Sequence, residues 1–396
     1  MQRERKWEKL LRLHDMLNRK YIIFGRNVGN VLGQIRSFGE AGISTHIIWY
    51  GDMPEPVKSS RYVSSFVEVK NEEEGIAILK EKFADNPNKN VLSTDNDGIV
   101  SSFDMHYNEL KDWFIFFNAG EQGRLTKMMT KMQQCKLAAE KGLNIPLSEV
   151  VHVGDLPKQV KYPIFTKSLD SFDYDWKSSV SICNSEKELM DYYSKRVKDS
   201  EILLQEYVAK INEYILQGIS FDNGNVLYLP IEGGYYRLPK DAYGSYLYFK
   251  GYRGGEELKQ KLLAMFKEIR YNGVFEIEFL QDKNDKLYFL EINFRHTLWN
   301  HTFTDMGINL STIWADSMIA NKLVLNGASI RKEPHNLMRE FQDWMRCMKD
   351  GNQSLIGWFK DFKKTDSFVI WDKKDKKPFF VYIYAMVKHI IKKHIL

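Results

Sequence analysis

Two neighbouring predicted strands carry acidic and amide side chains at alternate positions. The strands span residues 274–280 and 286–295. Because successive side chains of a strand point to opposite faces, one face of this pair collects the polar residues. They are Glu276, Glu278, Glu291, Asn293 and Arg295. A two-residue turn at residues 284–285 would place Glu278 directly opposite Glu291, and Glu276 opposite Asn293.

The Glu278–Glu291 pair predicts a bound divalent metal ion. Directly opposed side chains have Cβ atoms about 5 Å apart, and two carboxylates at that separation repel by about 3 kcal/mol at an effective dielectric constant of about 20. A divalent cation would compensate this repulsion, and oxygen ligands suit Mg²⁺ or Mn²⁺. The candidate ligands are Glu278, Glu291 and Asn293, while Arg295 is placed for a phosphate or a carboxylate. The alternative is a solvated strand face whose charges relax into water.

Several other kinds of site are disfavoured. No Gly-x4-Gly-Lys-Ser/Thr motif occurs, so a bound nucleotide would need other lysines; Lys131 on a predicted helix and Lys167 at a strand end are candidates. The three cysteines are far apart and no His-Glu-x-x-His occurs, which disfavours a zinc hydrolase. A net charge of +5 is too small to indicate nucleic-acid binding by itself. Nucleic-acid binding through the basic ends of the chain would lack any recognition motif.

The apolar pattern predicts a cytoplasmic protein. No run approaches the roughly 18–20 apolar residues of a membrane-spanning helix, and the N-terminus is too charged for a signal peptide. Residues 381–396 have the pattern of a basic amphipathic helix that would lie on an anionic membrane, at its inner face. The alternative is a helix that docks on the protein's own core.

The chain begins with a predicted small, doubly wound α/β domain, residues 1–122. Between residues 21 and 50, a buried strand, a turn, a helix and a second strand form a βαβ unit. Its glycines at positions 25, 29 and 33 lack the dinucleotide-binding spacing, which favours a tight strand-to-helix turn. Residues 123–325 form a predicted central domain with α+β character, and residues 326–396 a basic, aromatic-rich extension.

The order of these parts resembles the ATP-grasp superfamily over about residues 125–320. In that family a helix lysine and a strand-end lysine reach the phosphates, a strand ending in Glu-Tyr-Val forms the adenine hinge, and a hairpin with Glu and then Glu-x-Asn holds the metals. The matching residues, in the family's order, are Lys131, Lys167, Gln205-Glu-Tyr-Val208, Glu278 and Glu291-Ile-Asn293. The resemblance implies an ATP-grasp fold preceded by a small α/β domain, with ATP and Mg²⁺ (or Mn²⁺) as cofactors.

The resemblance also implies individual roles. Glu206 and Val208 would contact adenine, and Glu213 the ribose hydroxyls. The two lysines would hold phosphates, and the trio of hairpin residues would bind the metal.

The sequence departs from the family pattern in two places, and these departures bear on which reaction the protein catalyses. Residues 168–182 contain no glycine, although the family's phosphate lid is normally glycine-rich. No carboxylate follows Arg295 until Asp305, which counts against bicarbonate activation of the biotin carboxylase kind. The sequence Glu-Ile-Asn-Phe-Arg is more similar to carboxylate–amine ligases of the D-aspartate ligase kind, some of which modify cell-envelope or capsule precursors.

The expected function is therefore an ATP-dependent carboxylate–amine ligase. A substrate carboxylate would be phosphorylated to an acyl phosphate with release of ADP, and an amine would displace phosphate to form an amide. The partners would be a small-molecule carboxylate and amine, free or linked to a lipid or sugar, and not a nucleic acid. Arg295 and, as a second candidate, Arg237 would hold substrate, although Arg237 has an equal alternative as a surface arginine. The rival hypothesis is a nucleotide-binding module without turnover.

Overall fold

The computed structural model describes residues 18–168, 181–198, 200–238, 244–351 and 353–395. The chain forms two compact units. The first contains residues 1–129, 215–277 and 292–396, and the second contains residues 130–214 and 278–291. Residues of the expected central domain, 123–325, contribute to both units.

The first unit contains a five-stranded parallel sheet. Its strands are β1 (Tyr21–Gly25), β2 (Thr45–Trp49), β3 (Val63–Glu68), β4 (Asn90–Thr94) and β5 (Phe114–Ile115). They lie in the order β3-β2-β1-β4-β5, and every neighbouring pair is parallel. The central strand β1 is buried throughout, as expected for a parallel sheet covered by helices. This confirms the predicted α/β fold of the first part of the chain.

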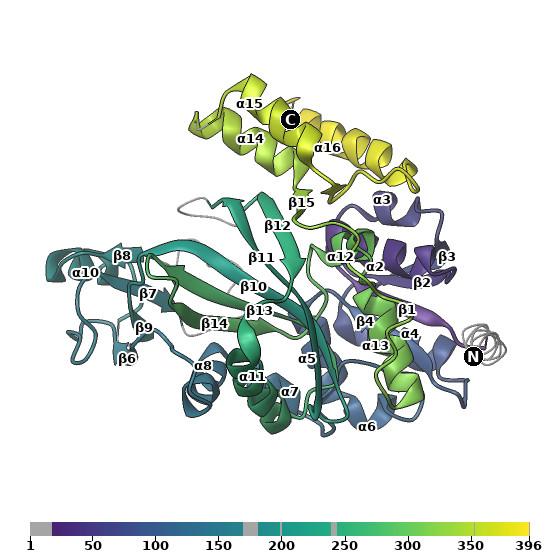
Figure 1. Ribbon diagram of the computed structural model, residues 1–396, viewed down its shortest axis with the longest axis horizontal. Coiled ribbons are helices and arrows are strands. Elements are labelled where there is room, and N and C mark those ends of the chain that lie inside the picture. Colours follow the sequence, from purple (N-terminus) through teal and green to yellow (C-terminus); the bar gives the residue numbers. More distant parts are fainter. Residues whose placement is uncertain (1–17, 169–180, 199, 239–243, 352, 396) are drawn as a thin grey trace. The chain divides into compact units, whose positions relative to one another are not determined.

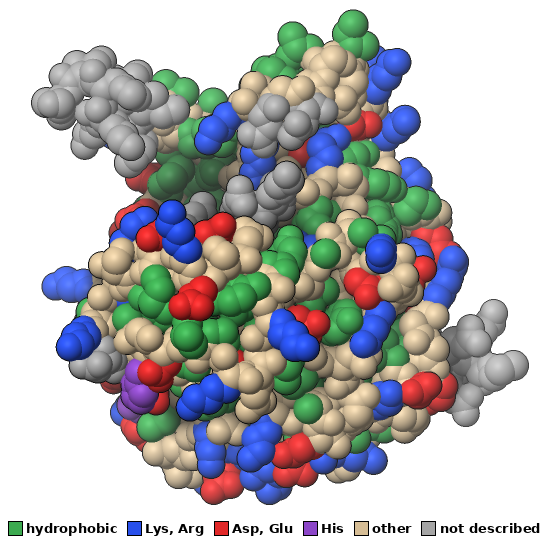
Figure 2. All heavy atoms as spheres, turned by 90° about the vertical axis from the view of Figure 1, so that its left-hand side faces the viewer, with side chains coloured by type: hydrophobic (Ala, Val, Ile, Leu, Met, Phe, Trp, Pro, Cys, Tyr) green, Lys and Arg blue, Asp and Glu red, His purple; other side chains and the backbone are tan. Residues whose placement is uncertain are grey.

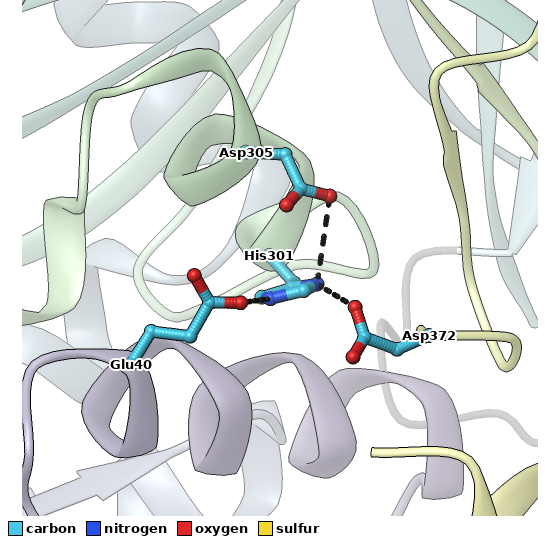
Figure 3. A group of neighbouring side chains, drawn as sticks. All are labelled: Glu40, His301, Asp305 and Asp372. Atoms are coloured by element: carbon cyan, nitrogen blue, oxygen red, sulfur yellow. Dashed lines mark hydrogen bonds and ion pairs between the residues drawn. The ribbon is translucent and has the colours of Figure 1, made fainter. Parts of the chain in front are cut away.

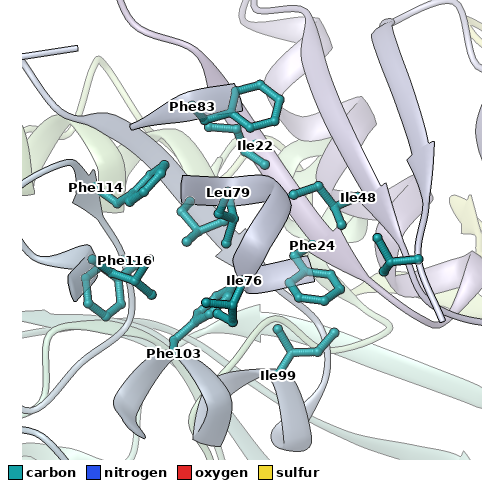
Figure 4. Packing of buried hydrophobic residues seen from close by; sticks show 13 residues of the cluster. Ile22, Phe24, Ile48, Ile76, Leu79, Phe83, Ile99, Phe103, Phe114 and Phe116 are labelled. Atoms are coloured by element: carbon teal, nitrogen blue, oxygen red, sulfur yellow. The ribbon is translucent and has the colours of Figure 1, made fainter. Parts of the chain in front are cut away.

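Helices of the α/β part cover the sheet with apolar side chains (Figure 4). They are α2 (Val28–Glu40), α3 (Pro54–Lys58), α4 (Glu72–Phe83), α5 (Asp97–Met105) and α6 (Tyr107–Leu110). One core cluster joins buried residues of β1, β2 and β4 to residues of α4 and α5. Its labelled members are Ile22, Phe24, Ile48, Ile76, Leu79, Phe83, Ile99, Phe103, Phe114 and Phe116.

The glycines of the first βαβ unit permit close packing. A Cβ atom on Gly25 would lie 2.2 Å from Val31 Cγ2, and one on Gly29 would lie 2.6 Å from Leu298 Cδ1. Asn27 caps α2 by accepting hydrogen bonds from the N–H groups of Gly29 and Asn30. These contacts agree with the tight strand-to-helix turn that the glycine spacing favours.

An antiparallel hairpin sheet occupies the centre of the chain. Its strands are β10 (Lys210–Phe221), β11 (Val226–Arg237), β12 (Tyr246–Gly251), β13 (Gly273–Asp282) and β14 (Leu287–Asn293), extended by β15 (His335–Met338) and β16 (Ser367–Phe368). The strand order is β14-β13-β10-β11-β12-β15-β16. Asp222, Asn223 and Gly224 all have positive φ angles and form the tight turn between β10 and β11. The C-terminal extension therefore contributes two strands at one end of the sheet: β15 pairs with β12, and β16 forms the edge parallel to β15.

The remaining helices of the first unit are α7 (Arg124–Met128), α11 (Gly255–Ile269), α12 (Asn300–Met306), α13 (Leu310–Ala320), α14 (Glu340–Asp350), α15 (Leu355–Lys364) and α16 (Lys377–Ile395). Helices α14, α15 and α16 gather at one end of this unit (Figure 1). Phe341 of α14 stacks on Phe379 of α16, with ring centroids 5.8 Å apart. Within the described residues, no helix has the length and apolar character to cross a membrane.

The second unit is built on a four-stranded antiparallel sheet. It contains α8 (Lys131–Glu140), β6 (Ser148–His152), β7 (Ile164–Ser168), β8 (Ser181–Cys183), α10 (Glu186–Tyr193) and β9 (Glu201–Glu206). The strand order is β6-β9-β7-β8. Helix α8 is separate from α7, because the chain leaves helical geometry at Thr130.

Charged side chains of both signs are interspersed on the described surface that Figure 2 shows. This distribution agrees with the small net charge of +5. The basic N-terminal segment, residues 1–17, lies outside the described residues, as do the side chains of residues 389–396.

We expect His296 to make the fold less stable as the pH falls. The ring is fully buried and packs edge-on against Phe117, with centroids 5.6 Å apart. Burial lowers the pKa of His296 to about 3. The unfolded chain, with a histidine pKa of about 6.5, therefore takes up the proton first. The stabilisation is complete above pH 6.5 and is lost progressively toward pH 3.

Denaturant unfolding at pH 7.5 and pH 5 measures this effect in the wild type and in His296→Leu. From the two pKa values, the wild type should lose about 2 kcal/mol more than the variant over this interval. Equal losses in the two proteins would show that His296 is protonated in the folded chain.

Candidate nucleotide and metal site

The hairpin between β13 and β14 turns differently from the sequence-based prediction. The N–H of Asp282 donates to the Lys286 carbonyl at 3.1 Å, and the N–H of Asp285 donates to the Asp282 carbonyl at 3.0 Å. The turn thus contains three residues, with Asp285 in a left-handed conformation (φ 59°). The predicted two-residue turn is wrong because the Asp282 carboxylate accepts the N–H groups of Asn284 and Lys286 and stabilises the longer turn. The direct opposition of Glu278 and Glu291 was derived from the two-residue turn and loses that basis, because Asp282 lies opposite Lys286 and the rings of Phe279 and Phe289 contact each other, with centroids 5.8 Å apart.

Farther from the turn, a buried polar network confirms that Glu276 and Asn293 are neighbours. Asn293 Nδ2 donates to Glu276 Oε1 at 3.3 Å, and Thr297 Oγ1 donates to Glu276 Oε2 at 3.1 Å. Gln217 of β10 also donates its amide N–H to Oε2. Glu276 is only 3% exposed, and these donors offset the cost of burying its carboxylate.

Arg295 extends this network to the parallel sheet. Its Nε and Nη2 atoms each lie 2.9 Å from one oxygen of Asp97, in a bidentate arrangement. Nη2 also donates to Asn293 Oδ1 at 3.1 Å. Burial alone would lower the pKa of Arg295, but the Asp97 carboxylate outweighs burial and raises it. The structure therefore brings Asn293 and Arg295 together and fixes both side chains.

A second carboxylate of the first unit, that of Asp95, interacts electrostatically with Arg295. It follows β4 and accepts the N–H groups of Arg26 at 3.0 Å and Asn27 at 2.9 Å. Burial raises the pKa of Asp95 to about 6, while the two N–H groups and the positive charge of Arg295 oppose the shift. Asp95 thus holds the turn between β1 and α2 against the end of β4.

In the second unit, Lys131 and Glu291 come together. Lys131 Nζ lies 3.3 Å from Glu291 Oε2, and both side chains are partly accessible. The N–H of Phe289 donates to the Asn144 carbonyl at 2.8 Å, which holds β14 beside the chain that follows α8. The expected phosphate lysine and one expected metal ligand are therefore neighbours, and Glu278 in the same unit is half-buried.

Lys167 lies on β7, in register with Leu203 of β9. The Lys167 side chain and residues 169–180, which make up most of the expected lid, lie outside the described residues. Their predicted contacts with phosphates stay predictions.

The expected hinge residues follow the end of β9. Glu206 Oε2 accepts the N–H of Leu147 at 3.3 Å, and the Val208 carbonyl accepts the N–H of Lys210 at 2.8 Å. The Glu213 carboxylate is ion-paired with Lys210. Their assignment to adenine and ribose rests on the sequence resemblance.

Arg237 has partners of a different kind. Its guanidinium donates to both oxygens of Asp343, at 3.1 and 2.6 Å, and to Asp361 at 2.6 Å. It also lies over the ring of Tyr246, 4.5 Å from the centroid. These hydrogen bonds hold α14 and α15 against the end of β11. They favour a structural role for Arg237.

Sequence reasoning missed several members of the Glu276 network as site residues. The alternation of the strand already placed Glu276 on the same face as Glu278, and the acidic run at Asp95–Asp97 follows a predicted strand, so these two signals were present. Gln217 and Thr297 had no such signal, because Gln217 reaches Glu276 through the tertiary pairing of β10 with β13, and Thr297 reaches it from the segment after β14.

Comparison with known proteins gives structural neighbours only. No protein-family model matches the chain, and no curated protein matches its sequence. An N5-carboxyaminoimidazole synthetase from Staphylococcus aureus superposes with a TM-score of 0.62 at 14% identity, covering 85% of this chain and 87% of the other. An L-amino acid ligase from Bacillus licheniformis gives a TM-score of 0.58 at 14% identity, covering 78% and 76%.

The biotin carboxylase domain of a Hydrogenobacter thermophilus 2-oxoglutarate carboxylase, in complex with MgADP, gives a TM-score of 0.58 at 16% identity, covering 76% of this chain and 70% of that chain. All three superpose on at least 76% of this chain. The chain therefore has the ATP-grasp fold, as the resemblance of its sequence predicts.

Proposed function

We propose that the protein is an ATP-dependent carboxylate–amine ligase that uses Mg²⁺ or Mn²⁺. The observation that supports this most strongly is the 3.3 Å pairing of Lys131 with Glu291, because it joins the expected phosphate lysine to an expected metal carboxylate. The fold is shared with an L-amino acid ligase and with N5-carboxyaminoimidazole synthetases. These neighbours are ATP-dependent ligases of the ATP-grasp type, which adds support.

The hairpin residues suit a hard dication. Glu278, Glu291 and Asn293 offer two carboxylates and an amide oxygen, which is the donor set that Mg²⁺ and Mn²⁺ prefer. When bound, the ion would neutralise charge on the nucleotide phosphates. Lys131 and Lys167 would hold the phosphates, Glu206 and Val208 the adenine, and Glu213 the ribose.

The chain's own residues would act mainly by positioning and charge neutralisation. A substrate carboxylate oxygen attacks the γ-phosphorus, the bond to the β-phosphate bridge oxygen breaks, and ADP leaves. The amine then attacks the acyl carbon and phosphate leaves, which forms the amide. Arg295 is the candidate for the transferring phosphoryl group or the substrate carboxylate, and its bonds to Asp97 and Asn293 orient it.

A cell-envelope precursor, linked to a lipid or a sugar, is the proposed substrate class. The amphipathic character of α16 supports this. Phe380, Tyr384 and Val387 are spaced to share one helix face and are 61%, 70% and 48% exposed, while other residues of the helix pack on the first unit. This exposed face, with the neighbouring lysines, would contact an anionic membrane from its inner side.

Glu291→Gln should abolish turnover without unfolding the protein. Neutralising the carboxylate removes a metal ligand and the partner of Lys131, but a partly exposed ion pair is worth only about 1 kcal/mol or less. ADP release, measured with the acid and amine that support the fastest wild-type turnover, should fall below about 1% of wild type. The melting temperature without ligands should change by no more than about 4 °C, and Mg-ATP should raise it less than in the wild type.

The matched control is Glu257→Gln, which removes a carboxylate whose side chain is 85% exposed on α11. It should retain wild-type turnover. Wild-type turnover in Glu291→Gln would remove this residue from the metal site.

The reaction should release ADP and inorganic phosphate rather than AMP and pyrophosphate. An acyl-phosphate route transfers one oxygen of the acid to phosphate, so ¹⁸O-labelled acid should yield singly labelled phosphate. Hydroxylamine should trap a hydroxamate when the amine is omitted, and mass spectrometry across a matrix of acids and amines identifies the products. AMP formation would indicate adenylation, and nucleotide binding without turnover on any pair would favour the non-catalytic module.

Replacing Phe380 and Tyr384 by serine should weaken binding to anionic vesicles, because the exposed face of α16 loses its largest apolar side chains. Sedimentation with phosphatidylglycerol-containing vesicles at low salt measures the bound fraction, which should fall several-fold. Val197→Ser, at an equally exposed site (77%) in the second unit, is the control and should bind as wild type. An intact protein that does not sediment with the vesicles would contradict membrane contact.

A further inference from the structure

Four metal-ligating side chains lie together in the first unit, on segments far apart in the sequence. Glu40 is the last residue of α2, and Asp372 lies in the segment before α16. His301 and Asp305 lie one turn apart on α12. One ligand atom from each lies within 4.8 Å of all the others (Figure 3). None of these residues belongs to the hairpin network.

The two ring nitrogens of His301 have different surroundings. Nε2 lies 3.0 Å from Glu40 Oε1, at hydrogen-bond distance. On the opposite side of the ring, Nδ1 faces Asp305 Oδ2 at 3.9 Å and Asp372 Oδ2 at 4.0 Å, which is too long for hydrogen bonds (Figure 3). The side chain is 8% exposed, so Nδ1 points into a nearly buried space between two carboxylates.

These distances suit a metal ion between Nδ1 and the two carboxylates. Metal–nitrogen and metal–oxygen bonds of about 2.0–2.2 Å span at most about 4.2 Å between two ligand atoms. When Nε2–H donates to Glu40, Nδ1 carries the lone pair that a metal requires. A carboxylate that accepts the other N–H of a metal-binding histidine is the usual arrangement around such ligands.

Each carboxylate is held in place by other bonds. Asp372 Oδ1 accepts the N–H groups of Lys374 and Asp375, at 2.7 and 2.8 Å, so that Oδ2 is turned toward His301. Asp305 Oδ2 accepts the hydroxyl of Ser367 at 2.7 Å. Glu40 is held by His301 Nε2 through Oε1 and by the ammonium group of Lys374 through Oε2.

The charge balance of the cluster also favours a dication. Three carboxylates face one ammonium group, that of Lys374, and an imidazole that is neutral in the tautomer described above. The excess of two negative charges equals the charge of one divalent ion. The Asp305 side chain is 25% exposed, which leaves a route for the ion and room for water ligands.

We propose that His301 Nδ1, Asp305 and Asp372 bind one divalent transition-metal ion, with Glu40 orienting the histidine. A nitrogen and two carboxylate oxygens suit Zn²⁺ or Mn²⁺ better than Mg²⁺. The ion links α12 to the segment that leads into α16, and through Glu40 it also holds the end of α2. Helix α2 packs directly on α12 here, since a Cβ atom at Gly33 would lie 3.5 Å from the His301 backbone nitrogen, an ordinary contact distance.

Calorimetric titration of the full chain with Zn²⁺, after chelator treatment and without nucleotide, tests the proposal; Mn²⁺ is the second probe. One equivalent of at least one ion should bind tightly and raise the melting temperature. Asp372→Asn and Asp305→Asn keep the side-chain shape and the oxygen that accepts hydrogen bonds, so the fold should persist while metal affinity falls at least about 100-fold. Glu40→Gln should weaken binding by about 10- to 100-fold.

Two controls separate this site from others. Asp112→Asn, an exposed carboxylate far along the chain from the cluster, and Glu291→Gln in the hairpin should both bind the ion as wild type does. X-ray absorption of the wild-type Zn²⁺ complex should show nitrogen and oxygen ligands without sulfur, which tests the site even if a variant fails to fold. No tight binding of either ion, unchanged affinity in both aspartate variants, or a sulfur ligand would overturn the proposal.

Discussion

The burial of one carboxylate determines much of the arrangement around the hairpin. Glu276 lies inside the sheet at 3% exposure, and a buried carboxylate is tolerated only when donors surround it. Gln217 from β10, Asn293 from β14 and Thr297 after β14 supply those donors. This requirement ties the register of three chain segments to a single side chain.

The same network connects the hairpin to the parallel sheet. Asn293 donates its amide N–H to Glu276 and accepts a hydrogen bond from Arg295 with its amide oxygen. Arg295 in turn donates two hydrogen bonds to Asp97 at the start of α5. As a proposed metal ligand, Asn293 is held from both sides and would lose few side-chain orientations on binding an ion, which favours affinity. In the second unit, Lys131 and Glu291 form an ion pair with each other. In the proposed complex, this pair would be replaced by two stronger ones, Lys131 with a phosphate and Glu291 with the metal ion.

The sequence predicts the strands and helices of this protein better than it predicts the side-chain contacts between them. Apolar runs and glycine turns predict the α/β start, and alternation along β13 and β14 predicts that Glu276 and Asn293 share a face. The three-residue turn at Asp285 was missed because it depends on side-chain bonds from Asp282 rather than on turn propensity alone. The contacts of Arg237 were missed for a related reason. Its partners, Asp343 and Asp361, lie more than 100 residues away in an extension that lacks a motif. The Glu40–His301–Asp305–Asp372 cluster depends on tertiary packing of α2 against α12, which no local pattern reveals.

The central claim is that the hairpin carries a metal–nucleotide site. A crystal structure with Mn²⁺ and ADP tests it most directly, because the anomalous scattering of manganese locates the ion without assumptions about the ligands. We expect a manganese peak within about 2.4 Å of oxygen atoms of Glu278, Glu291 and Asn293, with the ADP phosphates beside it and near Lys131. ADP bound elsewhere, or beside a manganese ion that none of these three side chains contacts, would contradict the account.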